Sequence, residues 1–301
     1  MDRFESMSIL VAAVEAGSLS SAARRLGTPL STVSRKVSDL ETHLKARLLN
    51  RSSRKLTLTD AGQAYVEACK RIIEDVGEAE RAASGEYSAP KGDLIITAPI
   101  VFGRLHVLPV AAEFLKVYPD VDIRFVLGDR LVNLFEDHVD LAVRIGELPD
   151  SSLIATRIGA IRRVVCGSPA YFAERGTPKN VGDIGMHDCI TFEGFSSPDM
   201  WVFRTDKSDA YIPVHSRLVV NTAEAAIDAA IAGLGITHVL SYQIANAVQA
   251  GVLAVVLQEY QPTTSPINLV YAGQRLLPLK LRAFLDFAAP RLKARLLQDT
   301  M

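Results

Sequence analysis

The sequence has few cysteines, and none is placed for pairing or for metal binding. Cys69, Cys166 and Cys189 are odd in number, widely separated and without a C-x-x-C pair. A disulfide framework and a zinc knuckle are therefore not encoded, and we expect a reducing compartment. The histidines are scattered, with no two at i and i+4. We predict that the protein holds neither a metal nor another cofactor.

Long hydrophobic runs are also absent. A membrane-spanning helix needs about 18 uninterrupted apolar residues, and Pro99 and Asp228 interrupt two of the apolar segments. At the N-terminus the negative charges of Asp2 and Glu5 exceed the positive charge of Arg3, so the following apolar stretch lacks the basic flank of a secretory signal. We expect a cytoplasmic protein that does not contact a membrane.

The usual catalytic signatures are missing as well. There is no G-x-G-x-x-G after a strand, no P-loop, no G-x-S-x-G elbow and no H-E-x-x-H. The turn at 233–235 contains two glycines but is more typical of packing than of phosphate binding. We predict that the protein is not an enzyme.

What is present fits a folded chain of more than one domain. With 301 residues, 49% hydrophobic and 22% charged, the sequence has a globular composition and the length of about two domains. Charge is distributed unevenly along the chain. Residues 1–58 contain ten Lys or Arg and five Asp or Glu, whereas the remaining residues contain 23 Lys or Arg and 29 Asp or Glu. A locally basic module suits a polyanion, since neutralised phosphates release counterions. A solvated helix face is the alternative.

Apolar spacing predicts three short helices in this basic module. The first has one apolar face: Phe4, Met7, Val11 and Val14. It is followed by Gly17, which ends it, and by Ser18, which can cap a second helix. Gly27 ends that second helix, and Thr28 with Pro29 supplies an N-cap and a first-turn proline for a third.

The third helix combines a buried face with a polar one. Its apolar positions recur at helical spacing: Val33, Val37, Leu40 and Leu44. Its polar positions carry short hydroxyl side chains and one cation: Ser31, Thr32, Ser34 and Arg35. Such side chains suit insertion into the major groove of double-stranded DNA. An ordinary three-helix hairpin, the alternative, would not require this polar face.

A basic turn and a long helix follow. Arg51, Arg54 and Lys55 lie at the tip of a predicted hairpin, or wing, which can contact the phosphate backbone or the minor groove. Beyond Thr59, an apolar stripe predicts a helix of about six turns: Ala61, Tyr65, Ala68, Ile72, Val76, Ala79 and Ala83. Self-association would bury the stripe and present two recognition helices to two half-sites. Packing of the stripe on its own domain is the alternative.

The N-terminal region resembles the winged helix-turn-helix of LysR-type transcriptional regulators. The resemblance is carried by SLSSAARRLG at 18–27, STVSR at 31–35, LE at 40–41 and LTDAG at 58–62. It implies that Ser31, Ser34 and Arg35 contact bases or phosphates and that Arg51 and Arg54 lie on the wing. Thr32 is added from helix geometry. The resemblance also implies a homotetramer, with a dimer as its minimum.

After a breaker-rich linker near residues 85–92, strands alternate with helices, which indicates an α/β domain. Strands are expected at 94–97, 121–127, 141–145, 153–158, 163–166, 218–221, 236–240 and 267–271. Helices are expected at 111–117, 131–137, 222–232, 243–250 and 278–297.

This second region resembles the LysR-type sensor, a two-lobed fold like that of type 2 periplasmic binding proteins. TAPI at 97–100, DLAVRIG at 140–146 and AGLGI at 232–236 carry the resemblance. The overall fold class is thus α+β, with a winged helix-turn-helix at 1–59, a linker or dimerisation helix and hinge at 60–91, and an effector-binding domain at 92–301. One lobe would comprise 92–161 with 267–301, and the other 162–266.

Ligands of such sheets lie beyond the carboxyl ends of the strands, which defines a candidate effector site. Its residues are Pro99, Ile100, Val101, Phe102, Gly128, Asp129, Arg144 and Gly146 in one lobe, and Trp201, Phe203, Asn221 and Thr222 in the other. Aromatic walls, one cation and helix N-termini near Phe102 and Thr222 favour an organic acid as the effector. The alternatives are that Trp201 and Phe203 are core residues and that Arg144 pairs with an acid.

These features favour a sequence-specific transcriptional regulator controlled by a small, anionic effector. Its partners would be promoter DNA, the effector and further copies of itself, with RNA polymerase as an additional candidate. Two alternatives stay open. One is a ligand-independent DNA-binding repressor or architectural protein, and the other is an α/β enzyme fused to a DNA-binding module, for which no nucleophile or metal cluster is evident.

Overall fold

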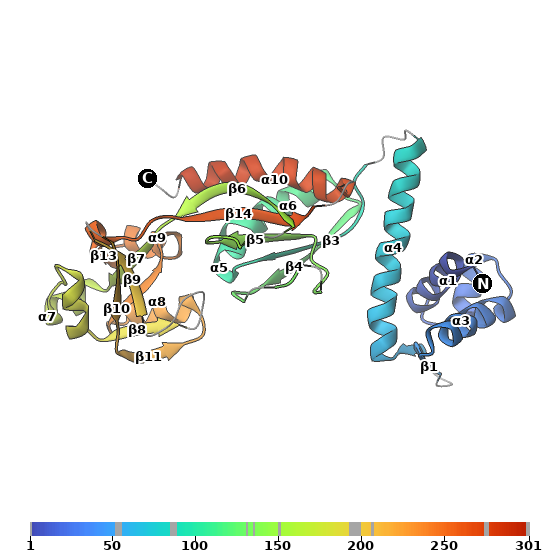
Figure 1. Cartoon of the computed structure of the whole chain (residues 1–301), viewed down its shortest axis with the longest axis horizontal. Helices are drawn as coiled ribbons and strands as arrows, with labels where there is room; N and C mark the ends of the chain where they lie inside the picture. The colour runs from blue at the N-terminus through green and yellow to red at the C-terminus, as the bar shows by residue number, and fades with distance from the viewer. Residues whose placement is uncertain are drawn as a thin grey trace. The chain divides into compact units, whose positions relative to one another are not determined.

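The computed structural model describes residues 2–51, 56–84, 89–130, 132–134, 136–149, 152–192, 200–205, 208–273 and 277–298, of which 51, 75, 78 and 81–84 are described by their backbone only. The chain forms two compact units, Met1–Ser88 and Ala89–Met301. Both are drawn in Figure 1, and each is described by itself.

The first unit contains the predicted helices and hairpin. Its elements are α1 (Arg3–Glu15), α2 (Leu19–Leu26), α3 (Leu30–Leu44), β1 (Leu49–Arg51), β2 (Leu56–Leu58) and α4 (Asp60–Ser84). As predicted, Ser18 caps α2, since its hydroxyl accepts a hydrogen bond of 3.0 Å from the Ser21 amide. Gly27 ends α2 in the left-handed region, with φ of 61°, a conformation that glycine adopts without a steric penalty.

The predicted cap of α3 is wrong. Pro29, not Thr28, occupies the N-cap position and Leu30 begins the helix; no side chain caps it. The Thr28 hydroxyl instead donates to the Leu26 carbonyl at 3.3 Å, across the turn between the two helices. Local bonds of this kind compete with capping for the same short side chain.

The core of the first unit joins all of its helices to the hairpin. Leu10 of α1, Val33 and Leu40 of α3 and Val66 of α4 are buried together. The Glu41 carboxylate accepts hydrogen bonds from two successive backbone amides at the entry to β1, at 2.8 and 3.1 Å. The strands β1 and β2 pair antiparallel, which confirms the hairpin over its described residues. Its tip at 52–55 lies outside the described residues.

The long helix α4 packs on its own unit through a different stripe from the predicted one. Gly62, Val66 and Cys69 are buried against the body. Within the predicted stripe, Tyr65 packs at the edge of this core, whereas Ile72 is exposed. Side chains at adjacent helical positions face different directions, so one face of α4 is covered and the neighbouring one is open.

The second unit is built on two five-stranded sheets, named here lobe 1 and lobe 2. The lobe 1 sheet has the order β4-β3-β5-β14-β6 and the lobe 2 sheet the order β11-β8-β12-β7-β13, with a separate β9-β10 hairpin. The lobe 1 strands are β3 (Gly92–Ala98), β4 (Val121–Leu127), β5 (Leu141–Ile145), β6 (Leu153–Ile161) and β14 (Ser265–Ala272). The other strands are β7 (Arg163–Gly167), β8 (Cys189–Phe192), β9 (Met200–Arg204), β10 (Asp209–Pro213), β11 (Ser216–Val220), β12 (Ile236–Leu240) and β13 (Ala254–Val256).

Helices cover these sheets. They are α5 (Ile100–Phe102), the π-helical turn η1 (Gly103–Val107), α6 (Leu108–Val117), α7 (Pro169–Arg175), η2 (Val181–Met186), α8 (Ala223–Ile231), α9 (Ser241–Gln249), η3 (Gln258–Tyr260) and α10 (Leu279–Gln298). Figure 1 shows α10 lying along the long strands β6 and β14. The chain passes from β6 to β7 through Arg162 and returns to lobe 1 with β14.

The predicted helix at 131–137 is wrong. Its described residues form turns, and residues 131 and 135 lie outside the description. Side chains hold the backbone here, because the Asp137 carboxylate accepts from the Asn133 amide at 3.0 Å and Arg144 binds the Val132 carbonyl. Such bonds offer the backbone an alternative to helix formation.

No single helix in the described ranges is long and apolar enough to cross a membrane. The helices α1 and α2 pass that test of length and composition only when taken together, and they are bent by 117° relative to each other.

Candidate functional site

The outer face of α3 is the first candidate site. Val33 and Val37 are buried and fix the rotation of the helix. Ser31 and Arg35 are exposed, and Thr32 and Ser34 are half-buried, so the four predicted side chains share the side of the helix away from the core. The helix thus presents hydroxyl groups and a guanidinium near its N-terminus, a pattern suited to base edges and phosphates.

The basic residues around this face differ in how they are paired. Arg25 forms an ion pair with Glu15 at 3.1 Å, and Lys36 forms one with Glu5. Arg35 makes no ion pair with any described residue. Its charge is therefore available to an external anion. Arg51 contributes its backbone to β1, whereas its side chain and the whole of Arg54 lie outside the described residues.

In lobe 1, part of the predicted effector site belongs to the core. Pro99 is the N-cap of α5, Val101 and Phe102 are buried among the core side chains, and Ile100 is half-buried. The side chains of Val101 and Phe102 are therefore packed in the lobe 1 core, and their expected role as pocket walls stays a prediction.

Asp129 occupies the helix end that we expected to bind an effector carboxylate. Its Oδ1 accepts a hydrogen bond from the Ile100 amide at 3.1 Å, so the protein supplies its own anion there. Gly128 precedes it and donates its amide to the Ala98 carbonyl at 3.0 Å, which closes the turn after β4.

The Arg144 side chain donates hydrogen bonds to backbone carbonyl groups. Its Nη2 donates to the Val132 carbonyl at 2.6 Å, and its side chain makes no ion pair with a described acid. Burial lowers the pKa of this guanidinium. Arg144 thus holds the loop after residue 129, and the alternative of a neighbouring acid is not seen among the described residues. Gly146 has φ of 113°, and its amide donates to the Pro266 carbonyl at 2.9 Å.

In lobe 2, the two predicted aromatic residues are core residues, which was the alternative interpretation. Trp201 and Phe203 are buried on β9, and both pack near the His238 ring, with ring centroids 5.2 and 5.3 Å from it. Burial, together with the nearby Arg163 charge, lowers the pKa of His238 well below its usual value, so this imidazole is neutral at neutral pH.

The N-terminus of α8 remains accessible. Asn221 is exposed, and the Thr222 hydroxyl caps the helix by accepting from the Ala225 amide at 3.3 Å. In the first turn, Glu224 forms an ion pair of 3.4 Å with Arg104 of η1, which joins lobe 2 to lobe 1. This pair joins the turn that follows α5 to the first turn of α8.

The polar groups at the lobe boundary were not predicted from the sequence. Tyr242, at the start of α9, packs edge-on against Phe102 and His106 of lobe 1. Arg163 begins β7 directly after the crossing, opposite Leu240 of β12. The position of Arg163 beside the predicted crossing was the available signal. No sequence pattern indicated that Tyr242 would contact the other lobe.

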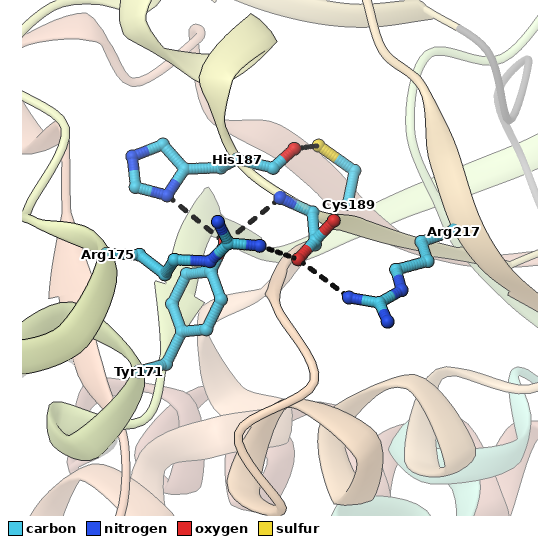
Figure 2. Close-up of polar contacts among 6 residues, drawn as sticks. Tyr171, Arg175, His187, Cys189 and Arg217 are labelled. Atoms are coloured by element: carbon cyan, nitrogen blue, oxygen red, sulfur yellow. Dashed lines mark hydrogen bonds and ion pairs between the residues drawn. The ribbon is translucent and has the colours of Figure 1, made fainter.

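A second polar cluster lies within lobe 2 (Figure 2). Arg175 and Arg217 donate hydrogen bonds to the Asp188 carboxylate from two sides, at 2.8 and 2.9 Å. The Tyr171 hydroxyl accepts a hydrogen bond from the Asp188 amide and contacts the His187 ring. Burial raises the pKa of the neighbouring Cys189 thiol to about 12. The buried thiol is therefore held in its protonated form, in which it is a poor nucleophile.

A surface pocket of about 460 Å³ lies along α10, between Pro90, Tyr118 and Arg282, and none of the predicted effector residues lines it. Among the described residues, no group of His, Cys, Asp and Glu is arranged to hold a metal ion.

Known proteins resemble this chain over nearly its whole length. It is 36% identical over 288 residues to an HTH-type transcriptional regulator of Xanthomonas campestris pv. campestris, covering 94% of this chain and 84% of that protein. It is 33% identical over 289 residues to an HTH-type transcriptional repressor of Pseudomonas aeruginosa, covering 95% and 91%. The solved structure of CrgA, a LysR-type transcriptional regulator from Neisseria meningitidis, matches with a TM-score of 0.62 and 32% identity, covering 96% and 98%.

Two family models match the two parts of the chain. The lysR-family model described as a bacterial regulatory helix-turn-helix protein matches residues 4–63, and the LysR substrate binding domain matches residues 88–293. The first spans the helices and the hairpin, and the second spans both sheets. The chain therefore belongs to the family of LysR-type transcriptional regulators, with an N-terminal helix-turn-helix region and a C-terminal effector-binding domain.

Proposed function

We propose that this regulator recognises specific promoter sequences through the outer face of α3 and that a small organic anion controls it. Ser31, Thr32, Ser34 and Arg35 would contact bases or phosphates in the major groove, and Arg51 and Arg54 would contact the backbone from the wing. The observation that carries this proposal is the exposed Arg35 guanidinium, which lies beside two hydroxyl-bearing positions and makes no ion pair with a described residue.

Self-association follows from the surface of α4. Ile72 is 43% exposed although it lies in an apolar stripe, and the neighbouring stripe of the helix already packs on its own domain. Pairing of two such helices would bury the open stripe and place two copies of α3 on two half-sites. A tetramer would pair two of these dimers, and RNA polymerase is the candidate partner at the promoter. A regulator that binds promoter DNA acts in the cytoplasm.

The effector would bind where the two lobes meet. Ile100 and Asp129 in lobe 1 and Asn221 and Thr222 in lobe 2 are the predicted residues with accessible surface close to the Arg104–Glu224 pair. A ligand that contacts both lobes favours their closed arrangement, which biases how the DNA-binding regions are held. The similarity to regulators favours this function over an enzyme. A ligand-independent repressor would show no effector-dependent change in DNA binding.

Replacement of Arg35 by Ala tests the DNA-binding proposal. We expect the affinity for a duplex from upstream of the protein's own gene to fall about 10- to 100-fold, because a bidentate base contact contributes about 1–3 kcal/mol. Fluorescence anisotropy over a salt series would measure this, with a scrambled duplex as reference. Arg25→Ala is the matched control, since Arg25 is already paired with Glu15. Equal affinity of Arg35→Ala and wild type for the cognate duplex would remove Arg35 from recognition.

A further inference from the structure

The Arg163 side chain is partly shielded from water and has no ion-pair partner among the described residues. This residue is half-buried at the start of β7, and its side chain makes no hydrogen bond or ion pair with any described residue. Burial lowers the pKa of its guanidinium. An unpaired, desolvated charge is costly in a folded protein and is retained where something else compensates it.

Two other polar groups beside Arg163 also lack partners. The Tyr242 hydroxyl and the Nε2 atom of His238 are buried, and neither meets a partner at hydrogen-bond geometry in the described part of the chain, although the Gln243 side chain lies close enough to lower the pKa of the hydroxyl. The strand register explains why the three lie together: Leu240 pairs with Arg163, so His238 lies on the same face of the sheet, one diagonal step away. Tyr242 follows Leu240 by two residues and extends from the end of the same strand.

The nearby acids do not neutralise Arg163. Asp129 lies close enough to Tyr242 to raise the pKa of its hydroxyl, after the larger effect of burial, but its carboxylate is bonded to the Ile100 amide. Glu224 is paired with Arg104. Both acids are therefore occupied at the beginnings of helices, and the Arg163 charge remains uncompensated.

We propose that Arg163, with the Tyr242 hydroxyl and His238 Nε2, binds the carboxylate of the effector at the point where the chain crosses between the lobes. The three groups can all donate hydrogen bonds, and a guanidinium fork matches the two oxygens of a carboxylate. The Tyr242 ring, which packs edge-on against Phe102, gives this point an apolar side that suits an apolar body attached to that carboxylate. This inference rests on the proposed effector binding. It names Arg163, instead of Arg144, as the cation that binds the effector.

The site would also couple binding to lobe position. Arg163 and His238 belong to the lobe 2 sheet, whereas the Tyr242 ring is packed against Phe102 and His106 of lobe 1. All three groups belong to lobe 2, so an anion held between Arg163 and Tyr242 acts on lobe 1 through the Tyr242 ring, which packs on it. Its binding energy would differ between lobe arrangements, which is the condition for control by a ligand.

The test uses the full chain and thermal denaturation. Acetate, succinate and benzoate are titrated against wild type, each compared with its neutral amide at matched ionic strength. We expect at least one carboxylate to raise the melting temperature while its amide does not, because a ligand that binds only the folded state stabilises it. Arg163→Gln should weaken that binding by at least about tenfold, and Tyr242→Phe by about fivefold.

Arg162→Gln is the matched control, because Arg162 is the adjacent arginine and is exposed; it should bind as wild type does. Without ligand, Arg163→Gln should melt at the same temperature as wild type or a few degrees higher, since it removes an uncompensated charge. The inference is overturned if no carboxylate stabilises wild type more than its amide does, or if Arg163→Gln binds that carboxylate as tightly as wild type. The binding of duplex DNA without ligand distinguishes a failure of this inference from a failure of the proposed function. If Arg163→Gln still binds the duplex, only the assignment of the effector site is contradicted. If wild type itself does not bind DNA, the proposed function is contradicted.

Discussion

Asp188 shows how one carboxylate joins segments that are distant in sequence. Arg175 from α7 and Arg217 from β11 both bind its Oδ2 atom, and its amide binds the Tyr171 hydroxyl (Figure 2). Burial alone would raise the pKa of Asp188, but hydrogen bonds from the two arginines outweigh it, and the pKa lies below its usual value. The folded protein thus stabilises the ionised form.

Replacement of Asp188 by Asn should therefore destabilise the protein in a pH-dependent way. A carboxyl whose pKa is lowered on folding contributes stability above its unfolded pKa of about 3.9, and that contribution is lost as the pH falls through the folded-state pKa. We expect the variant to melt about 2–4 °C below wild type at neutral pH, a small effect because the pair is partly exposed to solvent. The difference should narrow below about pH 4.

Thermal melts from pH 7 to pH 3 would measure this difference, with Asp209→Asn as control, since Asp209 forms a more exposed pair with Arg204. A melting-temperature gap that stays constant over the whole range would show that the Asp188 charge is not its source.

The comparison of Arg144 with Arg163 shows what sequence can predict about single residues. Each arginine lies in a strand, and the pattern placed Arg144 correctly on β5. Its partner, the Val132 carbonyl, belongs to a segment that we expected to be helical, so the sequence could not show that Arg144 was already bonded. Strand patterns predict the face a side chain occupies, whereas hydrogen-bond partners depend on the conformation of loops.

Elements were predicted better than contacts. The bounds of β4, β5 and β12 match the expected ranges, because each is a continuous apolar or alternating run of strand length. The helix α8 lies within its expected range, with Thr222 as its cap. The segment 131–137 failed because side-chain bonds to the backbone replaced helical ones, and spacing alone does not report such bonds.

The position of α4 depends on one glycine. A Cβ atom at residue 62 would lie 1.9 Å from the Leu48 carbonyl oxygen, which is backbone and cannot move without displacing the wing. Thr59 reinforces this junction, since its hydroxyl donates to the Arg47 carbonyl at 2.6 Å. The start of α4 and the entry to β1 are thus packed backbone to backbone.

Gly62→Ala should consequently destabilise the DNA-binding unit although alanine is the better helix former. We expect a loss of roughly 2–4 kcal/mol, the range of a severe packing clash, and weaker DNA binding because the wing is displaced. Urea denaturation followed by far-ultraviolet circular dichroism would measure it. Gln63→Ala, at an exposed position of the same turn, is the control and should change stability by less than about 0.5 kcal/mol. If Gly62→Ala is as stable as the control, the close approach of α4 to Leu48 is not required.

At the scale of the whole molecule, the second unit is one chain divided over two sheets. The Tyr242 ring packs into the lobe 1 core although α9 belongs to lobe 2, and the Arg104–Glu224 pair adds a polar link. An exposed ion pair contributes little to stability and can separate readily. Among the described residues, Leu240 and Tyr242 pack on the lobe 1 core near the crossing and the Arg104–Glu224 pair adds a weak polar contact, an arrangement that permits a ligand to change the relative position of the lobes.

Self-association of α4 makes a prediction for the assembled protein. Ile72→Glu places a charge in the open apolar stripe, and burying an unpaired carboxylate in an interface is strongly unfavourable. We expect this variant to sediment as a smaller species than wild type and to bind a duplex with two half-sites about 10²- to 10³-fold more weakly, because the second contact is no longer intramolecular. Its affinity for a single half-site should be unchanged, since Ile72 is exposed and lies outside the core of its own unit. Gln63→Glu adds the same charge at an exposed position off the stripe and should retain the wild-type assembly and affinity. Sedimentation equilibrium and anisotropy measure the two effects separately, and an Ile72→Glu variant with the wild-type assembly would show that this stripe is not the interface.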